Sequence, residues 1–257
     1  MTVQVQREGA VAVVTIDRPE AMNALDVETL GELRDRLTEL RKEDAVRVIV
    51  LTGAGDKAFA AGADIKYMSQ LSVEQAKEWG ALGHQVGQLL ETAPKVSLAA
   101  INGFALGGGC ELALACDMRY AATTAKLGQP EVNLGIFPGW GGTQRLARVC
   151  GLGVAKDLIL TGRVVDAKEA RRIGLVNDVF EPGDLMETTL KIAHLIASKG
   201  PLALAEAKAA INHSLQGDYV KSLEAEAQGF GELFSSNDAR EGMTAFVEKR
   251  DPRFAGR

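Results

Sequence analysis

Residues 96–111 read VSLAAINGFALGGGCE and place three kinds of predicted local structure in a row. Val96 to Ile101 is an apolar run just after Pro94, which predicts a short buried strand. Three glycines at 107–109 follow, and Glu111 to Ala115 is typical of the first turns of a helix. A buried strand, a glycine-rich turn and a helix in this order favour a parallel α/β arrangement, with backbone N–H groups left open in the turn.

The same rhythm of strand and helix extends through the first half of the chain. Further strands are predicted at Val3–Gln6, Val11–Ile16, Arg47–Thr52 and Met118–Ala122, the first two forming a hairpin. Asp26 is expected to cap a helix whose leucines recur at helical spacing. Ser72 and Gln75 have the spacing of a capping box at the start of another helix. The pattern predicts a parallel sheet with helical crossovers.

The second half is predicted to be almost wholly helical. Asp166 with Glu169 opens a short helix, and Pro201 stands where a helix start tolerates its missing N–H. A turn is expected near Gln216–Gly217, and a last helix near Asn237. Because no low-complexity linker intervenes, we expect a body over residues 1–199 and an attached helical region over residues 200–257.

Composition excludes several classes of protein. The 257 residues include 29 basic and 34 acidic side chains, a net charge of −5, and 46% of the residues are hydrophobic. The apolar content argues against a disordered chain, and the charge argues against a general nucleic-acid binder, which needs a basic face. The 28 glycines exceed the ordinary share of about 7%, so many tight backbone positions are expected.

Other residue types point away from metal, disulfide and membrane chemistry. Cys110, Cys116 and Cys150 are too few for a disulfide framework and are expected to be small apolar core residues. The three histidines have no ligand-like spacing, so no metal site is predicted. The first residues have no secretory pattern, and no apolar run approaches the ~20 residues of a membrane span. We therefore expect a cytoplasmic protein.

Two glutamates lie next to the glycine-rich segments. Glu111 follows the triple glycine, and Glu131 lies 20 residues later among small residues. A triple glycine alone also fits a tight packing corner, and either glutamate alone also fits a helix cap or an ion-pair partner. Two partly buried carboxylates facing one cavity would be costly unless they shared a proton or held a water. That arrangement is what a general acid–base pair requires.

Five ordered segments resemble those of one family. They are residues 17–25 (DRPEAMNAL), 58–66 (AFAAGADIK), 102–111 (NGFALGGGCE), 128–131 (GQPE) with 138–146 (PGWGGTQRL), and 241–250 (EGMTAFVEKR). Together they resemble the enoyl-CoA hydratase/isomerase (crotonase) family, most closely its short-chain hydratases. The resemblance implies an α/β fold of the ClpP-like crotonase type, a ββα-superhelix body with a helical C-terminal trimerisation region.

The resemblance also implies a chemistry for the site. The backbone N–H groups of Ala63 and Gly108 would form an oxyanion hole for a thioester carbonyl. Glu111 would act as base on a water molecule, and Glu131 would supply a proton to the carbon next to the thioester. The implied reaction is the reversible syn addition of water to a short-chain trans-2-enoyl-CoA, which gives a 3-hydroxyacyl-CoA.

Further positions are implied to bind the substrate. The residues expected to contact CoA or shape its cavity are Arg18, Ala21, Met22, Ala24, Ala61, Asp64, Ile65, Gln129, Gly139, Phe246 and Lys249. A neighbouring subunit would lend the last two. Met68, Leu71 and Trp140 would line the acyl pocket, where bulk favours a short chain, whereas Trp79 and Leu82 fit either that pocket or a helix's core face. Glu20 departs from the family, which often has a basic residue there; this leaves Arg18, Lys57, Lys66 and Lys249 for the phosphates.

The family implies a homo-oligomer, a hexamer built as a dimer of trimers, with CoA as part of the substrate and no metal or redox cofactor. Two alternatives stay open. One is a sibling of the same family, an enoyl-CoA isomerase or another acyl-CoA lyase; isomerisation needs one proton shuttle, whereas the presence of both Glu111 and Glu131 favours hydration. A non-catalytic RNA- or protein-binding member is disfavoured by the negative charge and by the glutamate pair.

Overall fold

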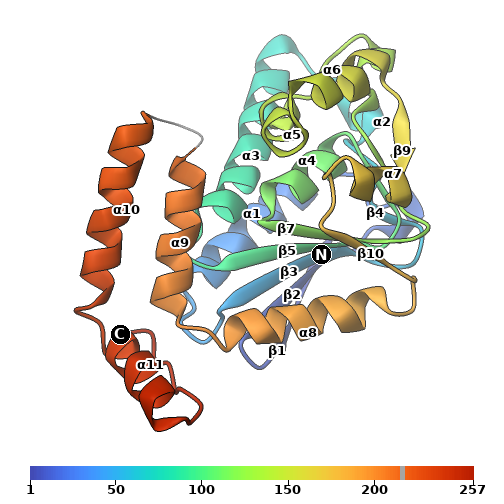
Figure 1. Ribbon diagram of the computed structural model, residues 1–257. Coiled ribbons are helices and arrows are strands. Elements are labelled where there is room, and N and C mark those ends of the chain that lie inside the picture. Colours follow the sequence, from blue (N-terminus) through green and yellow to red (C-terminus); the bar gives the residue numbers. More distant parts are fainter. Residues whose placement is uncertain (215–217) are drawn as a thin grey trace.

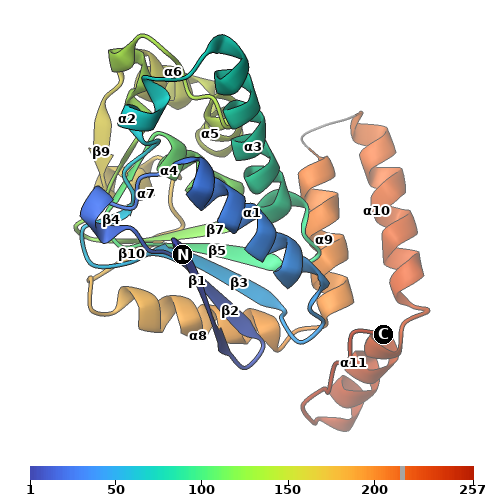
Figure 2. The same cartoon turned by 180° about the vertical axis from the view of Figure 1, so that it is seen from behind.

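The protein is described by a computed structural model that covers residues 1–214 and 218–257 (Figures 1 and 2). Its main sheet has the strand order β1-β2-β3-β5-β7-β10. The strands are β1 (Val3–Glu8), β2 (Val11–Ile16), β3 (Val48–Gly53), β5 (Val96–Ile101), β7 (Met118–Ala122) and β10 (Asp178–Phe180). β1 pairs antiparallel with β2, and the other pairs are parallel. The predicted hairpin and parallel sheet are confirmed.

A second, smaller sheet escaped the sequence analysis. It has the order β4-β6-β8-β9, and its strands are β4 (Ala58–Ala60), β6 (Phe104–Leu106), β8 (Lys126–Gly128) and β9 (Val164–Asp166). The expectation of an almost wholly helical second half was wrong for β9 and β10. Three-residue strands are too short to show a period of two, so only their pairing with distant segments reveals them.

Both faces of the main sheet are covered by helices. On one face lie α1 (Val27–Lys42), α3 (Val73–Thr92) and α4 (Gly108–Ala115), and on the other lies α8 (Leu185–Ala197) (Figures 1 and 2). Ile49 and Leu51 join the core on the first face, and Val48 and Val50 join the core beside α8. Because successive strand side chains alternate, burial on both faces explains the continuous apolar runs.

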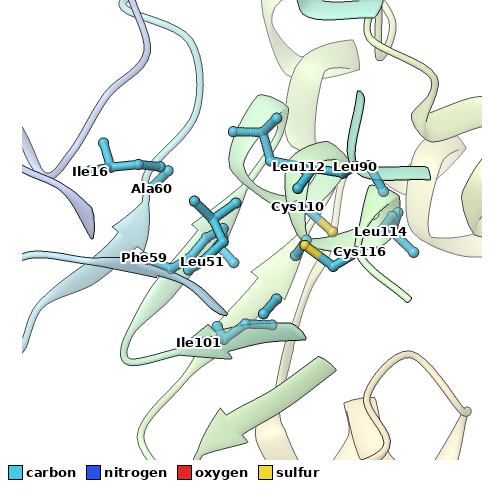
Figure 3. Close-up of a cluster of buried hydrophobic side chains, with 14 of the residues drawn as sticks. Ile16, Leu51, Phe59, Ala60, Leu90, Ile101, Cys110, Leu112, Leu114 and Cys116 are labelled. Carbon is cyan, nitrogen blue, oxygen red and sulfur yellow. The ribbon is translucent and has the colours of Figure 1, made fainter. Parts of the chain in front are cut away.

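The larger of these cores lies directly under the glycine loops. Figure 3 shows Ile16, Leu51 and Ile101 of the main sheet near Phe59 of β4 and Leu112 of α4. Cys110 and Cys116 lie in the same core, as predicted, whereas Cys150 is only partly buried. The two sheets and α4 are therefore held together by one apolar cluster.

The predicted helix starts are confirmed at their caps. The Asp26 carboxylate accepts from Thr29 N (2.8 Å), and the Asp166 carboxylate accepts from Glu169 N (2.8 Å). Ser72 and Gln75 form the reciprocal capping box of α3. One boundary differs, because α4 begins at Gly108 rather than near Glu111. Glu111 is thus the fourth residue of the helix.

The connecting elements are short. They are η1 (Pro19–Ala21), α2 (Ile65–Met68), η2 (Pro130–Leu134), α5 (Gly142–Cys150), α6 (Leu152–Thr161) and α7 (Ala167–Arg172). η2 contains Glu131, which was expected in a loop. Within the described residues, no helix is long and apolar enough to cross a membrane.

The C-terminal helices are α9 (Pro201–His213), α10 (Tyr219–Leu233) and α11 (Asn237–Glu248). α9 lies against the body through Lys208, whose buried ammonium donates to Leu90 O (2.7 Å) and Lys95 O (2.9 Å) and pairs with Asp117 (2.9 Å). α10 lies beside α9, and α11 lies away from the body in both views (Figures 1 and 2). The turn expected near Gln216–Gly217 lies outside the described residues, and the division at residue 200 stays a prediction.

Candidate active site

Two of the predicted CoA-binding segments, residues 18–25 and 61–65, lie side by side. Ala61 N donates to Met22 O (3.0 Å), Leu25 N to Gly62 O (2.8 Å), and Asp64 N to Leu25 O (2.9 Å). The pairing brings Ala21, Met22 and Ala24 next to Ala61, Asp64 and Ile65. The predicted segments therefore form one continuous wall.

Asn23 organises this wall and was missed by the sequence analysis. Its buried side-chain amide donates to Ala58 O (2.7 Å) and Ala54 O (3.0 Å), beyond the end of β3. Met22 and Asn23 both have left-handed backbones, with φ of 55° and 56°. An asparagine in a Pro-x-x-x-Asn turn is the one signal in the sequence, because asparagine tolerates this conformation better than most residues.

The predicted basic residues of the wall differ in their surroundings. The Arg18 guanidinium pairs with Asp26 (3.0 Å) and Asp64 (3.5 Å) and donates to Ala24 O (2.5 Å). It ties the two segments together, so its charge is already shared with two carboxylates. Lys57 and Lys66 are exposed, as is Glu20.

The N–H groups of Ala63 and Gly108 are both open. Among the described residues, no carbonyl or side chain accepts a hydrogen bond from either group. The Ala63 N–H stays free because the pairing with Leu25 uses Gly62 O and Asp64 N instead. Gly108 is the first residue of α4, where helix N–H groups lack intrahelical partners. A Cβ on Gly109 would lie 1.9 Å from Ala60 O, so only glycine lets α4 approach β4 this closely.

Glu111 is held by the turn that leads into α5. Glu111 is 3% exposed, and its Oε1 accepts hydrogen bonds from Trp140 N and Gly142 N, each at 2.7 Å. Burial raises the pKa of Glu111, while the two amide donors and the positive charge of Arg145 act in the opposite direction. The site therefore contains donors that stabilise a carboxylate at this position.

Glu131 has a different environment. Its Oε2 is buried and has no hydrogen-bond partner within the described residues, and its Oε1 lies 2.7 Å from the position of a Cβ on Gly107. Burial, with a smaller contribution from the charge of Glu111, raises the pKa of Glu131 to about 7. Glu111 thus has backbone donors that stabilise its carboxylate, and the Oε2 atom of Glu131 has none, a contrast that suits a base and an acid in one site.

Trp140 forms the floor beneath Gly108. A Cβ on Gly108 would lie 2.2 Å from Trp140 Cζ3, and one on Gly83 would lie 2.3 Å from Trp140 Cδ1. The ring contacts Trp79 edge to face, with centroids 5.1 Å apart, and Trp79 contacts Tyr67 in the same way at 5.4 Å. Trp79 is buried in the core, whereas Leu82 is partly buried and packs against it.

The remaining predicted pocket residues differ in burial. Met68 and Leu71 are partly buried against the same core as Trp140. Gln129 is fully buried, and neither of its amide atoms has a partner within the described residues; its Nε2 lies 2.7 Å from the position of a Cβ on Gly142. Gly139 is exposed at the preceding turn. That these residues line an acyl or CoA pocket stays a prediction.

Phe246 and Lys249 are not brought to this site within the chain. Phe246 lies on α11 and is 85% exposed, and Lys249 ends the same helix. α11 lies far from α2 and α4 in both views (Figures 1 and 2). No group of three or more metal-ligating side chains was found within residues 1–214 and 218–257.

The enoyl-CoA hydratase/isomerase family model matches residues 6–257 of this chain. The crotonyl-CoA hydratase of Syntrophomonas wolfei is 52% identical over 249 residues, which cover 97% of this chain and 96% of that protein. The short-chain-enoyl-CoA hydratase of Clostridium acetobutylicum is 50% identical over 245 residues, 95% of this chain and 94% of that protein.

Solved structures agree with the sequence relatives. The crystal structure of enoyl-CoA hydratase from Bacillus anthracis has a TM-score of 0.97 at 42% identity, with complete coverage of both chains. An enoyl-CoA hydratase subunit structure from Geobacillus kaustophilus has a TM-score of 0.94 at 41% identity, covering 100% of this chain and 99% of that one. The predicted α/β crotonase fold is confirmed, and the chain belongs to the enoyl-CoA hydratase/isomerase family.

Proposed function

We propose that this protein is an enoyl-CoA hydratase that adds water reversibly to a short-chain trans-2-enoyl-CoA such as crotonyl-CoA. The observation that carries the proposal is the pair of glutamates in contrasting environments beside two open backbone N–H groups. The names of the two bacterial relatives, crotonyl-CoA hydratase and short-chain-enoyl-CoA hydratase, support the same reaction and chain length.

The open N–H groups of Ala63 and Gly108 would donate to the thioester oxygen. When a nucleophile adds to C3 of the enoyl group, negative charge moves onto this oxygen, and donors fixed in advance stabilise that charge without reorganising. Gly108 begins α4, so the positive end of the helix dipole adds to the effect. Ala63 and Gly108 would therefore supply the electrostatic part of catalysis.

The two glutamates would carry the protons. Glu111, as a carboxylate, takes a proton from water while the water oxygen bonds to C3. Protonated Glu131 gives its proton to C2, which completes the addition and leaves Glu111 protonated and Glu131 ionised. Exchange of one proton with solvent at each group would restore the starting state. With both carboxyl groups on one side of the bound enoyl group, oxygen and hydrogen would arrive on the same face. The reverse sequence eliminates water from a 3-hydroxyacyl-CoA.

CoA would lie along the wall formed by residues 18–25 and 61–65. Phe246 and Lys249 of a neighbouring copy would complete its binding, since α11 leaves them remote from the site of their own chain. This proposal requires a homo-oligomer, which we expect to be a dimer of trimers. The absence of a metal or redox cofactor and a cytoplasmic location stay predictions.

The direct test is the loss of the enoyl-thioester absorbance of crotonyl-CoA on adding the protein. Glu111→Gln and Glu131→Gln should each lower kcat by about 10²–10⁴-fold, the usual contribution of a general acid or base. Activity that survives Glu131→Gln undiminished would contradict the mechanism. Conversion of a 3-enoyl-CoA to the 2-enoyl isomer without hydration would identify an isomerase instead.

A further inference from the structure

A buried arginine lies behind the proposed base. Arg145, in the first turn of α5, is 8% exposed. Its Nη1 donates to Trp140 O (2.8 Å), and its Nη2 pairs with Glu91 Oε2 of α3 (3.0 Å). Burying a guanidinium costs free energy even when it has such partners, which suggests that Arg145 has a role beyond packing.

Arg145 and Glu111 contact the same turn. The carbonyl of Trp140 accepts from Arg145, while the amides of Trp140 and Gly142 donate to Glu111 Oε1 at 2.7 Å. Arg145 therefore holds the peptide unit between Trp140 and Gly141, which lies between the two peptide units whose N–H groups donate to the carboxylate. A displaced guanidinium would change where these amides point, and with them the position of Glu111.

Two glycines provide the space for the guanidinium. A Cβ on Gly141 would lie 2.3 Å from Arg145 Nη1, and one on Gly87 of α3 would lie 2.9 Å from Nη2. Gly141 also has φ of 105°, a conformation that side chains rarely adopt. The guanidinium therefore fits closely between Glu91 on one side and the Trp140–Gly142 turn on the other.

The charges around Glu111 are few. Arg145 faces it from α5 and Glu131 from η2, and Glu91 faces Arg145 from α3. The other charged side chains on α3, α5 and α6 are exposed. Cys110, the preceding residue on α4, stays neutral, because its own burial and, to a lesser extent, the charges of Glu131 and Glu111 raise the pKa of its thiol. Arg145 is thus the positive charge within α3, α5, α6 and η2 that acts on Glu111.

We propose that Arg145 is a positioning residue for hydration: it orients the Trp140–Gly142 turn that holds Glu111 and places a positive charge near that carboxylate, with Glu91 as its counter-ion. The inference rests on the proposed function for the assignment of Glu111 as base. Nothing in the sequence pattern shows it, because residues 91, 111 and 145 meet only through the packing of α3, α4 and α5.

The test is the pH dependence of kcat/KM for crotonyl-CoA in the full-length protein. A base must be ionised, so Glu111 sets the acidic limb, and loss of a nearby positive charge raises its pKa. Arg145→Met should move this limb to higher pH by about one unit and lower kcat by about tenfold to a hundredfold, with KM unchanged. Arg145→Lys keeps the positive charge but cannot contact both Trp140 O and Glu91 as the planar guanidinium does. It should therefore lower kcat and leave the acidic limb in place.

Two further variants separate positioning from stability. Arg119 is 7% exposed and donates to Leu175 O (2.9 Å) and Cys116 O (2.7 Å), so Arg119→Met should lower stability without moving the limb. Glu91→Gln removes the counter-ion and should move the limb to lower pH. An acidic limb that stays in place in both Arg145→Met and Glu91→Gln would overturn the inference, and Glu91→Gln alone decides if Arg145→Met does not fold.

A second readout does not depend on activity. The Glu111 carboxyl can be titrated by ¹³C NMR in labelled protein, with Glu111→Gln to assign its resonance. A higher pKa in Arg145→Met than in wild type supports the role of Arg145, and an equal pKa overturns it. If the wild type fails to hydrate crotonyl-CoA, the proposed function is wrong, and this titration still tests the contact between Arg145 and Glu111.

Discussion

Gly108 shows how closely backbone and side chain meet at the site. The position of its missing Cβ is 2.2 Å from the Trp140 ring, which is itself enclosed by Gly83 and Trp79. Any side chain at residue 108 must therefore displace the ring or the first turn of α4. Since the N–H of the same residue is the proposed oxyanion donor, a change in packing at residue 108 also displaces a catalytic group.

Gly108→Ala should lower kcat for crotonyl-CoA by about 10²-fold, because the displaced N–H no longer meets the thioester oxygen. Overpacking should also lower the free energy of unfolding by about 1–3 kcal/mol. Steady-state kinetics and urea denaturation measure the two effects. Gly153→Ala is the matched control, since a Cβ there meets nothing within 4 Å; an equal loss of activity in both variants would contradict the prediction.

Glu131 should make stability fall as pH rises. Its pKa is raised from 4.5 to about 7, so the folded state binds this proton more tightly than the unfolded state does. Its contribution to the free energy of unfolding is complete below about pH 4.5 and is lost as pH rises through about 7. Urea titrations at pH 5 and pH 8 should show a larger decrease for wild type than for Glu131→Gln, and parallel decreases would refute the assignment.

At the scale of elements, the second sheet explains why distant glycine loops converge. β4, β6 and β8 pair in parallel, so the segments after them, which contain Ala63, Gly108 and Glu131, emerge at the same edge. The sequence analysis recognised each loop by its glycines and glutamates, but it did not identify the three-residue strands that align them. Their register depends on partners about 20 to 45 residues away along the chain.

α9 should depend on Lys208 for its attachment. Lys208→Met leaves two carbonyls and Asp117 without their buried donor, which should lower the free energy of unfolding by about 3–5 kcal/mol. Chemical denaturation followed by circular dichroism measures this loss. Lys199→Met, at an exposed lysine just before α9, should change stability by less than about 0.5 kcal/mol. Similar stabilities for the two variants would show that Lys208 does not anchor the helix.

At the scale of the whole molecule, α10 and α11 expose an unusual amount of apolar surface. Tyr219, Val220, Phe230, Phe246 and Val247 are each more than half exposed. The expected homo-oligomer would cover this surface and bring Phe246 to the site of another copy. The two proposals are linked, because an isolated chain cannot use a residue on α11 at its own site.

Phe246→Ala should therefore raise KM for crotonyl-CoA about tenfold while kcat changes little, since loss of one buried aromatic contact is worth roughly 1.5 kcal/mol. Val247→Ala, at a neighbouring residue that is 79% exposed, is the control and should leave KM unchanged. Light scattering measures the molar mass of the wild-type particle. A monomeric wild type, together with an unaltered KM in the Phe246→Ala variant, would contradict the shared site.

The sequence by itself determined five of the six strands of the main sheet, the capped helices, the family and the two glutamates, because buried strands, caps and glycine turns are local patterns. Only the tertiary structure decided that Asn23 joins two loops, that Trp140 lies under Gly108, and that Arg145 and Glu111 contact one turn. Those contacts join residues up to 35 positions apart. Burial and hydrogen bonding between such residues arise from packing, for which no local pattern exists.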